Sequence, residues 1–275
     1  MRTALTIAGS DSSGGAGIQA DLKTFAAFGL YGASAITAIT VQSTKGVEAV
    51  APLAADLVTA QIEAVAGDLA LHATKIGMLA TAAIVEAVAA AIEELELPLV
   101  VLDPVLVSTS GDRLLDPDGV QTLCMELMPL ARVVTPNIPE AEALSGRTIG
   151  SAQQAREAAR RIHDMGAASV IVTGGHAVWD GDTGPRAEGA GPQIIDLLFD
   201  GHVFHEFRTA RIDTRPTHGT GCTFASAVAA GLALGRELPD AVARAQQYVA
   251  GAVAHALGIG HGCGPIDHFW EHRSG

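Results

Sequence analysis

The sequence predicts an α/β fold in which a mainly parallel sheet carries helices on both faces. Three observations lead to this prediction. Several short apolar runs show no polar alternation, which is typical of strands buried on both faces. Between these runs, apolar residues recur at helical spacing. The two kinds of segment alternate along the chain, as they do in repeated strand–helix units with parallel strands.

The elements of this fold can be placed in order along the chain. The predicted strands are residues 5–8, 35–41, 74–78, 99–103, 133–135 and 169–173. The predicted helices are residues 18–28, 57–65, 84–92, 155–162, 224–234 and 238–257. Because no linker, repeat or low-complexity tract interrupts the series, we expect one domain over residues 1–275.

The region before the last two helices departs from the alternation. Residues 180–193 are rich in Gly, Asp and Pro and have no apolar period, which predicts an exposed loop. Residues 194–199 and 202–207 flank Asp200-Gly201, a pair that favours a tight turn between two strands. The sequence therefore predicts a hairpin at this end of the sheet.

The composition limits the kinds of partner. Of the 275 residues, 48% are hydrophobic and 17% are charged, so a sizeable core can be buried; the formal net charge is −13. This charge argues against nucleic acid, because phosphate backbones require basic patches. A polyanion such as ATP would have to be bound locally, by backbone amides and a metal ion. The three cysteines form no C-x-x-C pair, and no signal peptide or membrane-spanning stretch is recognised, so we expect a cytoplasmic protein.

The segment His218-Gly219-Thr220-Gly221-Cys222 is the most informative stretch of the chain. Its Gly-Thr-Gly turn runs into an apolar helix, whose first backbone amides have no intrahelical partners and form an anion hole. Such a hole suits the charge that develops on a transferring phosphoryl group. Cys222 lies at its mouth, where the helix N-terminus should lower the thiol pKa. A buried cysteine in a Gly-rich helix start is the alternative interpretation.

Polar side chains follow several predicted strands, at the edge where parallel α/β sheets bind ligands. Gln42 can both donate and accept, which suits the edge of a heterocycle. Asp103 can hold a divalent cation or its water shell. Asn137 can cap the next helix, which places Glu140 in its first turn beside the same crevice. Their shared position predicts a site for a small molecule, a metal and a phosphate donor.

Other residues at this edge have a structural alternative. The Gly-rich turn after the first strand, from Gly9 onward, matches neither the P-loop nor the dinucleotide fingerprint and alone would be an ordinary turn. Asp21 alone would be a solvated helix residue, and Met78 would more often belong to the core. Thr173 and Gly175 lie at the end of the sixth strand, where backbone amides are exposed.

Taken together, the motifs of this chain resemble those of the hydroxymethylpyrimidine/phosphomethylpyrimidine kinases of thiamine biosynthesis, a branch of the ribokinase-like superfamily. The matching stretches are LTIAGSD (5–11), GGAGIQADLKTF (14–25), KIGML (75–79), DPV (103–105), SGD (110–112), TPNIPEA (135–141), GGH (174–176), THGTGCT (217–223) and GHGCGPIDHF (260–269). They follow one another over nearly the whole chain, and the combination is specific although each piece is not.

The resemblance implies a three-layer α/β/α sandwich with a mostly parallel central sheet. It also implies a cytoplasmic homodimer that uses ATP and Mg²⁺. The substrate would be 4-amino-5-hydroxymethyl-2-methylpyrimidine, which is phosphorylated first to the monophosphate and then to the pyrophosphate. In this branch a cysteine, here Cys222, replaces the aspartate that serves the wider superfamily as the base.

The resemblance also assigns the site residues. Catalysis falls to Cys222 and to the anion hole of Gly219, Thr220 and Gly221. The pyrimidine would contact Gly9, Asp21, Gln42, Met78 and Val105. The nucleotide would contact Asn137, Glu140, Thr173 and Gly175, and the metal would be held by Asp103 and Glu140.

Two departures from the pattern concern phosphate binding. Many relatives have Lys where this chain has Thr109 and Thr173, so two cations that could neutralise phosphate are missing. This leaves the efficiency of the second phosphorylation open. A pyridoxal or pyridoxine kinase of the Cys-containing type is the first alternative, although Gln42 and Met78 favour a pyrimidine. A non-catalytic pyrimidine-binding domain is the second, but Asp103, Glu140 and the Gly-Thr-Gly turn are all present.

Overall fold

A computed structural model describes residues 1–108, 111–175, 193–212 and 218–273. Within these residues, nine strands form one sheet in the order β3-β2-β1-β4-β5-β6-β7-β8-β9. The neighbours from β2 to β7 pair in parallel, whereas β3, β8 and β9 join antiparallel at the two edges. The predicted sheet, mainly parallel with an antiparallel hairpin, is confirmed.

The strands are short at the centre of the sheet and longer toward both of its edges. They are β1 Thr3–Asp11, β2 Tyr31–Ser43, β3 Gly46–Pro52, β4 Ala73–Ile76, β5 Val100–Leu102, β6 Val133–Val134, β7 Val170–Val172, β8 Gln193–Phe199 and β9 Phe204–Ala210. Every residue of β4, β5, β6 and β7 is buried, which explains the absence of polar alternation in these runs.

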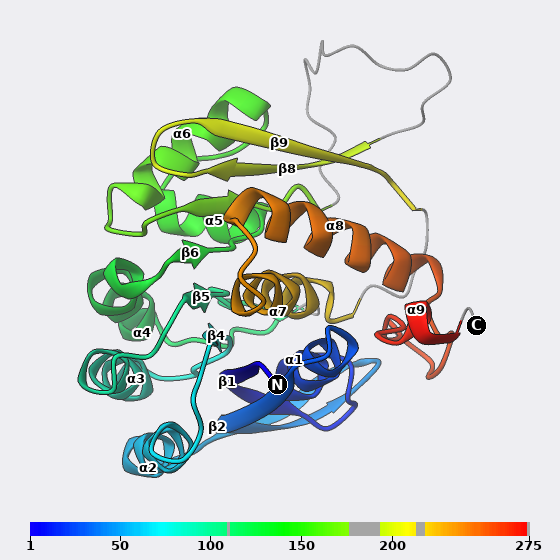
Figure 1. Ribbon diagram of the computed structural model, residues 1–275. Coiled ribbons are helices and arrows are strands. Elements are labelled where there is room, and N and C mark those ends of the chain that lie inside the picture. Colours follow the sequence, from blue (N-terminus) through cyan, green and yellow to red (C-terminus); the bar gives the residue numbers. More distant parts are fainter. Residues whose placement is uncertain (109–110, 176–192, 213–217, 274–275) are drawn as a thin grey trace.

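The helices form a layer on each face of the sheet (Figure 1). One layer holds α1 Gly17–Ala27, α7 Thr220–Ala233 and α8 Leu238–Ala254, with the short α9 Trp270–Arg273 beside α8. The other holds α2 Ala55–Ala66, α3 Ala82–Glu94, α4 Pro117–Thr122, a π-helical turn η1 Leu123–Leu127, a 3₁₀ turn η2 Met128–Leu130, α5 Ile138–Ser145 and α6 Ala152–His163. The three-layer α/β/α arrangement is therefore as predicted.

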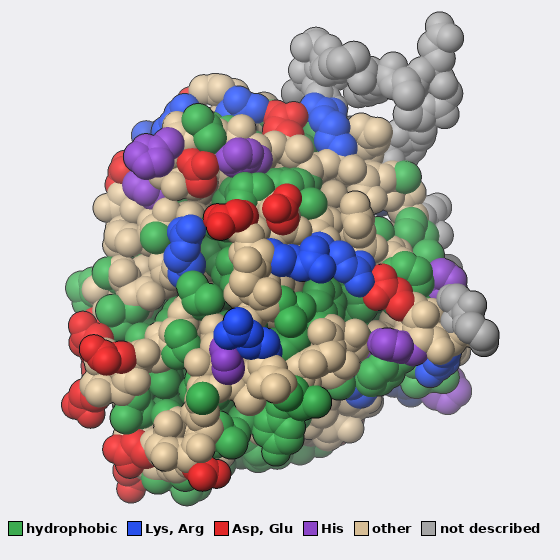
Figure 2. All heavy atoms as spheres, viewed as in Figure 1, with side chains coloured by type: hydrophobic (Ala, Val, Ile, Leu, Met, Phe, Trp, Pro, Cys, Tyr) green, Lys and Arg blue, Asp and Glu red, His purple; other side chains and the backbone are tan. Residues whose placement is uncertain are grey.

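Side chains that alternate along the central strands fill two separate cores. Leu5 and Ile7 of β1 belong to the core under α2 and α3, whereas Ala4 faces the core under α7 and α8. The second core is built largely from the small residues of α7, which is buried from Thr223 to Ala233 and lies close to the sheet. On the outer side of this layer, acidic and basic side chains are interspersed (Figure 2). No described helix is long and apolar enough to cross a membrane.

Several predicted element boundaries differ from those of the structure, and one strand was missed. The hairpin turn occupies residues 200–203, so β9 starts at Phe204 instead of 202, and α8 ends at Ala254 rather than 257. Strand β3 was not predicted at all, because its mostly exposed residues lie at the edge of the sheet, and its short apolar stretch carries no clear strand signal by itself. The predicted loop at 180–193 lies, except for Gln193, outside the described residues, as does Thr109.

Candidate active site

A cavity of about 200 Å³ opens at the carboxyl ends of the parallel strands. It is closed on one side by the start of α7 and on another by the loop between β1 and α1. All fourteen predicted site residues lie in the described part of the chain, and twelve of them line this cavity. The two exceptions are Asp21 and Gly175, and Gly175 is exposed beyond the end of β7. The sheet edge therefore gathers most of the predicted site.

The start of α7 is built as an anion hole. Gly219 precedes the helix with φ 85°, and a Cβ atom on it would lie 1.8 Å from the carbonyl oxygen of Gly15, so only glycine fits. No side chain caps this helix start. The amide of Thr223 already bonds the Gly219 carbonyl at 2.9 Å, but the earlier amides have no such partner in the helix. Gly221 faces open space, so an anion can approach these amides.

Cys222 occupies the first turn of α7 as a half-buried, free thiol in the cavity wall. The predicted lowering of its pKa is wrong. Burial raises the pKa of this thiol to about 12; the Lys75 cation opposes the shift, and the carboxylates of Asp103 and Asp21 add to it. The thiol forms a hydrogen bond with the Asp103 carboxylate, to which it donates. The resting form is therefore a neutral thiol that already has a proton acceptor beside it.

Asp21 lies behind the cavity wall, so the predicted contact with a pyrimidine is wrong. Its side chain is fully buried, and it accepts hydrogen bonds at 2.6 Å from both Thr6 and Ser226. It also forms an ion pair of 3.0 Å with Lys75 of β4. The position in α1 is adjacent to the site, but the side chain points into the protein and stabilises the Lys75 cation.

Lys75 was not among the predicted site residues, although it is a buried cation at the bottom of the cavity. Its side chain is 0% exposed, and its ammonium lies 3.8 Å from the Asp103 carboxylate as well as against Asp21. The two ion pairs raise its pKa against the effect of burial. One signal was available in the sequence: a lysine within an otherwise apolar strand is costly unless it is paired.

Asp103 and Glu140 bring two carboxylates to the same wall. Glu140 and Asn137 form a capping box at the start of α5, with two reciprocal hydrogen bonds of 2.9 Å between side chains and backbone amides. Burial and the nearby Asp103 raise the pKa of Glu140 to about 8. The Oδ2 atom of Asp103 is buried without a hydrogen-bond partner, and the Lys75 ammonium lies 3.8 Å from it, so this oxygen could also be a ligand of a bound cation.

This carboxylate pair fits a cation that arrives with a nucleotide. The described residues contain no group of three or more His, Cys, Asp or Glu side chains that could hold a metal by themselves. Mg²⁺ is usually bound by one or two carboxylates together with substrate phosphates and water. Two carboxylates facing an anion hole therefore suit Mg²⁺ bound to a triphosphate better than a resident metal.

The opposite wall combines an apolar surface with one amide. Met78 packs with Ala38 and Ala80, and Val105 contacts this cluster. A Cβ atom on Gly9 would lie 3.1 Å from the Met78 sulfur, so the glycine lets the methionine lie flat against β1. Gln42 lies at the end of β2, half-buried, with its amide at the cavity. An apolar surface beside one amide is suited to a flat, polar-edged ring.

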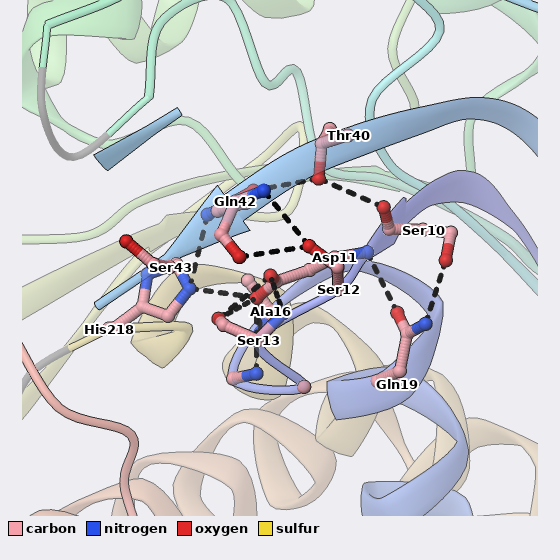
Figure 3. A network of polar contacts seen from close by, with 12 residues as sticks. Ser10, Asp11, Ser12, Ser13, Ala16, Gln19, Thr40, Gln42, Ser43 and His218 are labelled. Atoms are coloured by element: carbon pink, nitrogen blue, oxygen red, sulfur yellow. Dashed lines mark hydrogen bonds and ion pairs between the residues drawn. The ribbon is translucent and has the colours of Figure 1, made fainter. Parts of the chain in front are cut away.

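A network of polar contacts links Gln42 through His218 to Asp11 and the loop between β1 and α1 (Figure 3). Asp11 accepts hydrogen bonds from the amides of Gly15 and Ala16 and from the His218 Nε2 atom, at 3.1, 2.8 and 2.9 Å. Burial raises the pKa of Asp11, but these bonds and those from Ser13 outweigh it and lower the pKa to about 2. Neither Asp11 nor His218 was predicted as a site residue, although both stand in the motifs that carry the resemblance.

Comparisons with known proteins identify the family of this chain. A family model described as phosphomethylpyrimidine kinase matches residues 11–267. The hydroxymethylpyrimidine/phosphomethylpyrimidine kinase of Rhizobium meliloti is 49% identical over 270 residues, which are 97% of this chain and 96% of that protein. The thiamine biosynthesis bifunctional protein ThiED of Geobacter sulfurreducens is 47% identical over 264 residues, 96% of this chain; the chain spans about half, 51%, of that longer protein.

Among solved structures, the crystal structure of an ADP complex of Bacillus subtilis pyridoxal kinase is similar with a TM-score of 0.85. It is 37% identical, and the match covers 99% of both chains. The fold is thus shared with a kinase of a different name, whereas the family model and the sequence relatives carry the pyrimidine name. With the anion hole, Cys222 and Asp103 in one cavity, this chain belongs to the phosphomethylpyrimidine kinase family.

Proposed function

We propose that this protein transfers the γ-phosphoryl group of ATP to the hydroxymethyl group of 4-amino-5-hydroxymethyl-2-methylpyrimidine, and then phosphorylates the monophosphate to the pyrophosphate, in thiamine biosynthesis. One observation carries the proposal. The uncapped start of α7 places its amides and the Cys222 thiol in the same cavity as Gln42 and the apolar surface of Met78. The family model and the Rhizobium meliloti relative support this substrate, and the ADP complex of the structural neighbour supports ATP.

Phosphoryl transfer consists mainly of positioning and charge stabilisation, and different residues of the cavity would serve these two roles. The amides of Thr220 and Gly221 would receive the oxygens of the transferring group. Asn137 and Thr173 lie at the ends of β6 and β7, where they would border the nucleotide. Gln42 and Met78 would hold the pyrimidine so that its hydroxymethyl group points to Cys222.

Cys222 and Asp103 provide a path for the hydroxyl proton. Because the thiol is neutral and donates to Asp103, its sulfur can accept the hydroxyl proton only as its own proton passes to the carboxylate. One proton enters the thiol and one leaves it, so the hydroxyl proton ends on the Asp103 carboxylate, which becomes neutral, and the alcohol oxygen is left with the negative charge with which it attacks the γ-phosphoryl group. The Lys75 ammonium, 3.8 Å from that carboxylate, offsets the negative charge in the dry wall.

Mg²⁺ would be held by Asp103 and Glu140, directly or through water, and would neutralise charge on the ATP phosphates. The Oδ2 atom of Asp103, which has no hydrogen-bond partner, supports this assignment. The Lys residues of many relatives are replaced by Thr173 here and by Thr109, so neutralisation of the second phosphate would depend more on the anion hole and on Mg²⁺. The kcat/KM of the second phosphorylation, compared with that of the first, measures how well the anion hole and Mg²⁺ neutralise this phosphate.

The test of the proposed function is product analysis with ATP, Mg²⁺ and each candidate alcohol. The expected result is a monophosphate and then a pyrophosphate from the aminopyrimidine. A pyridoxal kinase is the second candidate, because the structural neighbour with a TM-score of 0.85 carries that name. A kcat/KM for pyridoxal above that for the aminopyrimidine would favour this candidate and reject the proposal.

Replacement of Gln42 should weaken the use of the aminopyrimidine. In Gln42→Leu the size is kept but both hydrogen-bonding functions are lost, and a ring left with unpaired polar groups should lose about 1–3 kcal/mol per bond not made. We expect kcat/KM for the alcohol to fall by this amount while the KM for ATP stays the same. Leucine in place of Gln153, an exposed residue of α6, is the matched control. Unchanged kcat/KM in Gln42→Leu would place this residue outside the site.

Replacement of Glu140 should separate its metal role from its capping role. Glu140→Gln keeps the shape and an oxygen that can accept from the Asn137 amide, but it removes the charge. We expect lower activity and a Mg²⁺ titration shifted to higher concentration. Glu157→Gln, at an exposed position of α6, is the control. A wild-type Mg²⁺ curve for Glu140→Gln would leave this residue only its role at the helix start.

The same variant has a predicted effect on stability. The pKa of Glu140 is raised to about 8 in the folded protein, so the folded state favours its protonated form. The contribution of Glu140 to the free energy of unfolding is complete below the pKa of an unfolded glutamate, about 4.3, and it is lost as the pH rises through 8. Glu140→Gln, which stays neutral, should therefore melt close to wild type at pH 4 and above it at pH 9. Thermal melts without nucleotide and metal measure this difference.

We also propose that the protein is a cytoplasmic homodimer. The three free cysteines support a reducing compartment. Ile39 and Val41, which are 43% and 54% exposed on β2, support a covered face on this part of the sheet. Light scattering on the purified protein tests the dimer.

A further inference from the structure

The orientation of the Gln42 side-chain amide is decided by its neighbours. The oxygen and nitrogen of a glutamine amide have the same shape, so their hydrogen-bond partners determine which atom lies where. In the structure the Gln42 Nε2 atom lies 3.3 Å from the His218 Nε2 atom, and the Gln42 Oε1 atom lies 3.1 Å from the Thr40 hydroxyl. Turning the amide by 180° exchanges these two atoms at the same positions. His218 and Thr40 each have a second hydrogen-bond partner, and that partner determines whether they can donate to Gln42 or accept from it.

His218 cannot accept a hydrogen bond from Gln42. Its Nε2 atom lies 2.9 Å from the Asp11 carboxylate, which also receives the Gly15 and Ala16 amides and acts as an acceptor only. The Nε2 atom must therefore carry a hydrogen, whether the imidazole is neutral or charged. Two N–H groups cannot bond each other, so the end of the Gln42 amide beside His218 has to be the oxygen.

Thr40 leads to the same orientation independently. Its hydroxyl has a single hydrogen, and it lies 3.0 Å from the backbone oxygen of Ser10, which can only accept. Once the hydroxyl donates to Ser10, its oxygen is left as an acceptor for the amide nitrogen of Gln42. In this arrangement no donor faces another donor. In the placement that the structure has, the Gln42 NH₂ group faces the N–H of His218, and the single Thr40 hydrogen is shared between the Ser10 oxygen and the Gln42 oxygen.

We propose that Asp11, His218, Thr40 and Ser10 lock the Gln42 amide with its oxygen toward His218 and its NH₂ group toward Thr40, and that this lock selects a 4-aminopyrimidine over a 4-oxopyrimidine. This rests on the proposed function. An aminopyrimidine edge presents an N–H donor beside a ring-nitrogen acceptor, and the 4-oxo ring presents the reverse pattern in the same pose. A fixed amide matches one pattern, while an amide free to turn matches both.

The functional test compares the 4-amino substrate with its 4-oxo analogue in wild type and in Thr40→Val. Valine keeps the shape of threonine but cannot accept from the amide. We expect the ratio of the two kcat/KM values to fall about tenfold, the worth of one net hydrogen bond, with the KM for ATP unchanged. Thr24→Val, which loses a buried hydroxyl in α1, is the control for folding and should keep the wild-type ratio. A wild-type ratio in Thr40→Val would overturn the lock as the source of selectivity.

A structural test separates this inference from the proposed function. Neutron crystallography of the deuterated, ligand-free protein locates the two amide deuterons of Gln42 directly. The expected result is a deuteron directed at Thr40 and another on His218 Nε2, directed at Asp11. Amide deuterons facing His218 would overturn the inference, whatever the enzyme phosphorylates. Failure of the wild type to phosphorylate either pyrimidine would reject the proposed function but leave this measurement unaffected.

Discussion

In Cys222→Ala, phosphorylation of the alcohol is expected to fall by ~10² to 10⁴-fold, the usual span for the loss of a general base. The thiol is the group between the hydroxymethyl site and the Asp103 carboxylate, so its removal interrupts the proton path. The anion hole should survive, because Gly219, Thr220 and Gly221 contribute backbone amides. Steady-state kinetics should therefore show a loss in kcat with little change in the KM for ATP.

The second phosphorylation should suffer less in the same variant. A phosphate monoester has a second pKa near 6 and is largely ionised at pH 7, so it scarcely needs a base. Cys222→Ser is the matched control, because a hydroxyl can also donate to Asp103 and accept from the substrate, and it should retain more first-step activity than alanine. Equal losses in the two steps would indicate a purely positional role. Full first-step activity of the alanine variant would make Cys222 a packing residue.

The raised pKa of this thiol has a consequence for its chemistry. Because only the thiolate reacts, alkylation should be slow at pH 7 and accelerate as the pH approaches 12. This is the reverse of the behaviour expected from the helix N-terminus alone. Mass spectrometry of the peptide that contains Cys222, after timed exposure to iodoacetamide at several pH values, measures the rate. Rapid alkylation near pH 7 would show a thiolate in the resting enzyme.

The layers of the fold could be predicted because their signals are local. Buried strands such as β5, β6 and β7 are apolar throughout, and α1 and α3 have apolar stripes at helical spacing. Strand β3 escaped because its sequence, GVEAVAP, gains its partner only by lying antiparallel to β2 at the sheet edge. Its pairing is a tertiary property that no local period reveals.

In the candidate site, too, the features set by local sequence could be predicted, whereas those set by tertiary neighbours could not. The anion hole was predicted because Gly219-Thr220-Gly221 specifies its own backbone shape before a helix. The direction of the Asp21 side chain could not be predicted, because a position in the first turns of α1 does not tell whether the carboxylate faces the cavity or the core. The pKa of Cys222 depends on burial and on Asp103 and Asp21, which the fold brings from β5 and α1. These neighbours outweigh the helix N-terminus, the only one of these influences that is visible in the sequence.

Replacement of the buried Lys75 is expected to cause a large loss in the free energy of unfolding. In Lys75→Met the apolar stem is replaced at similar volume, but Asp21 loses its cation, and Asp103 loses its nearby positive charge. Breaking a buried pair by removing one partner typically costs about 3–5 kcal/mol, because a buried charge is left uncompensated. We expect a loss of this size in the free energy of unfolding, measured by urea denaturation at pH 7.

A second variant distinguishes the lost charge pair from a packing defect. In Lys75→Met with Asp21→Asn, the buried charge is removed with its partner, while the Asn side-chain oxygen can still accept from Thr6 and Ser226. The double variant should therefore be more stable than Lys75→Met alone, and the cycle with Asp21→Asn gives the coupling energy of the pair. If the double variant were no more stable than Lys75→Met, the defect would lie in packing. A loss below about 1 kcal/mol in Lys75→Met, typical of an exposed pair, would contradict the expected cost of breaking this buried charge pair.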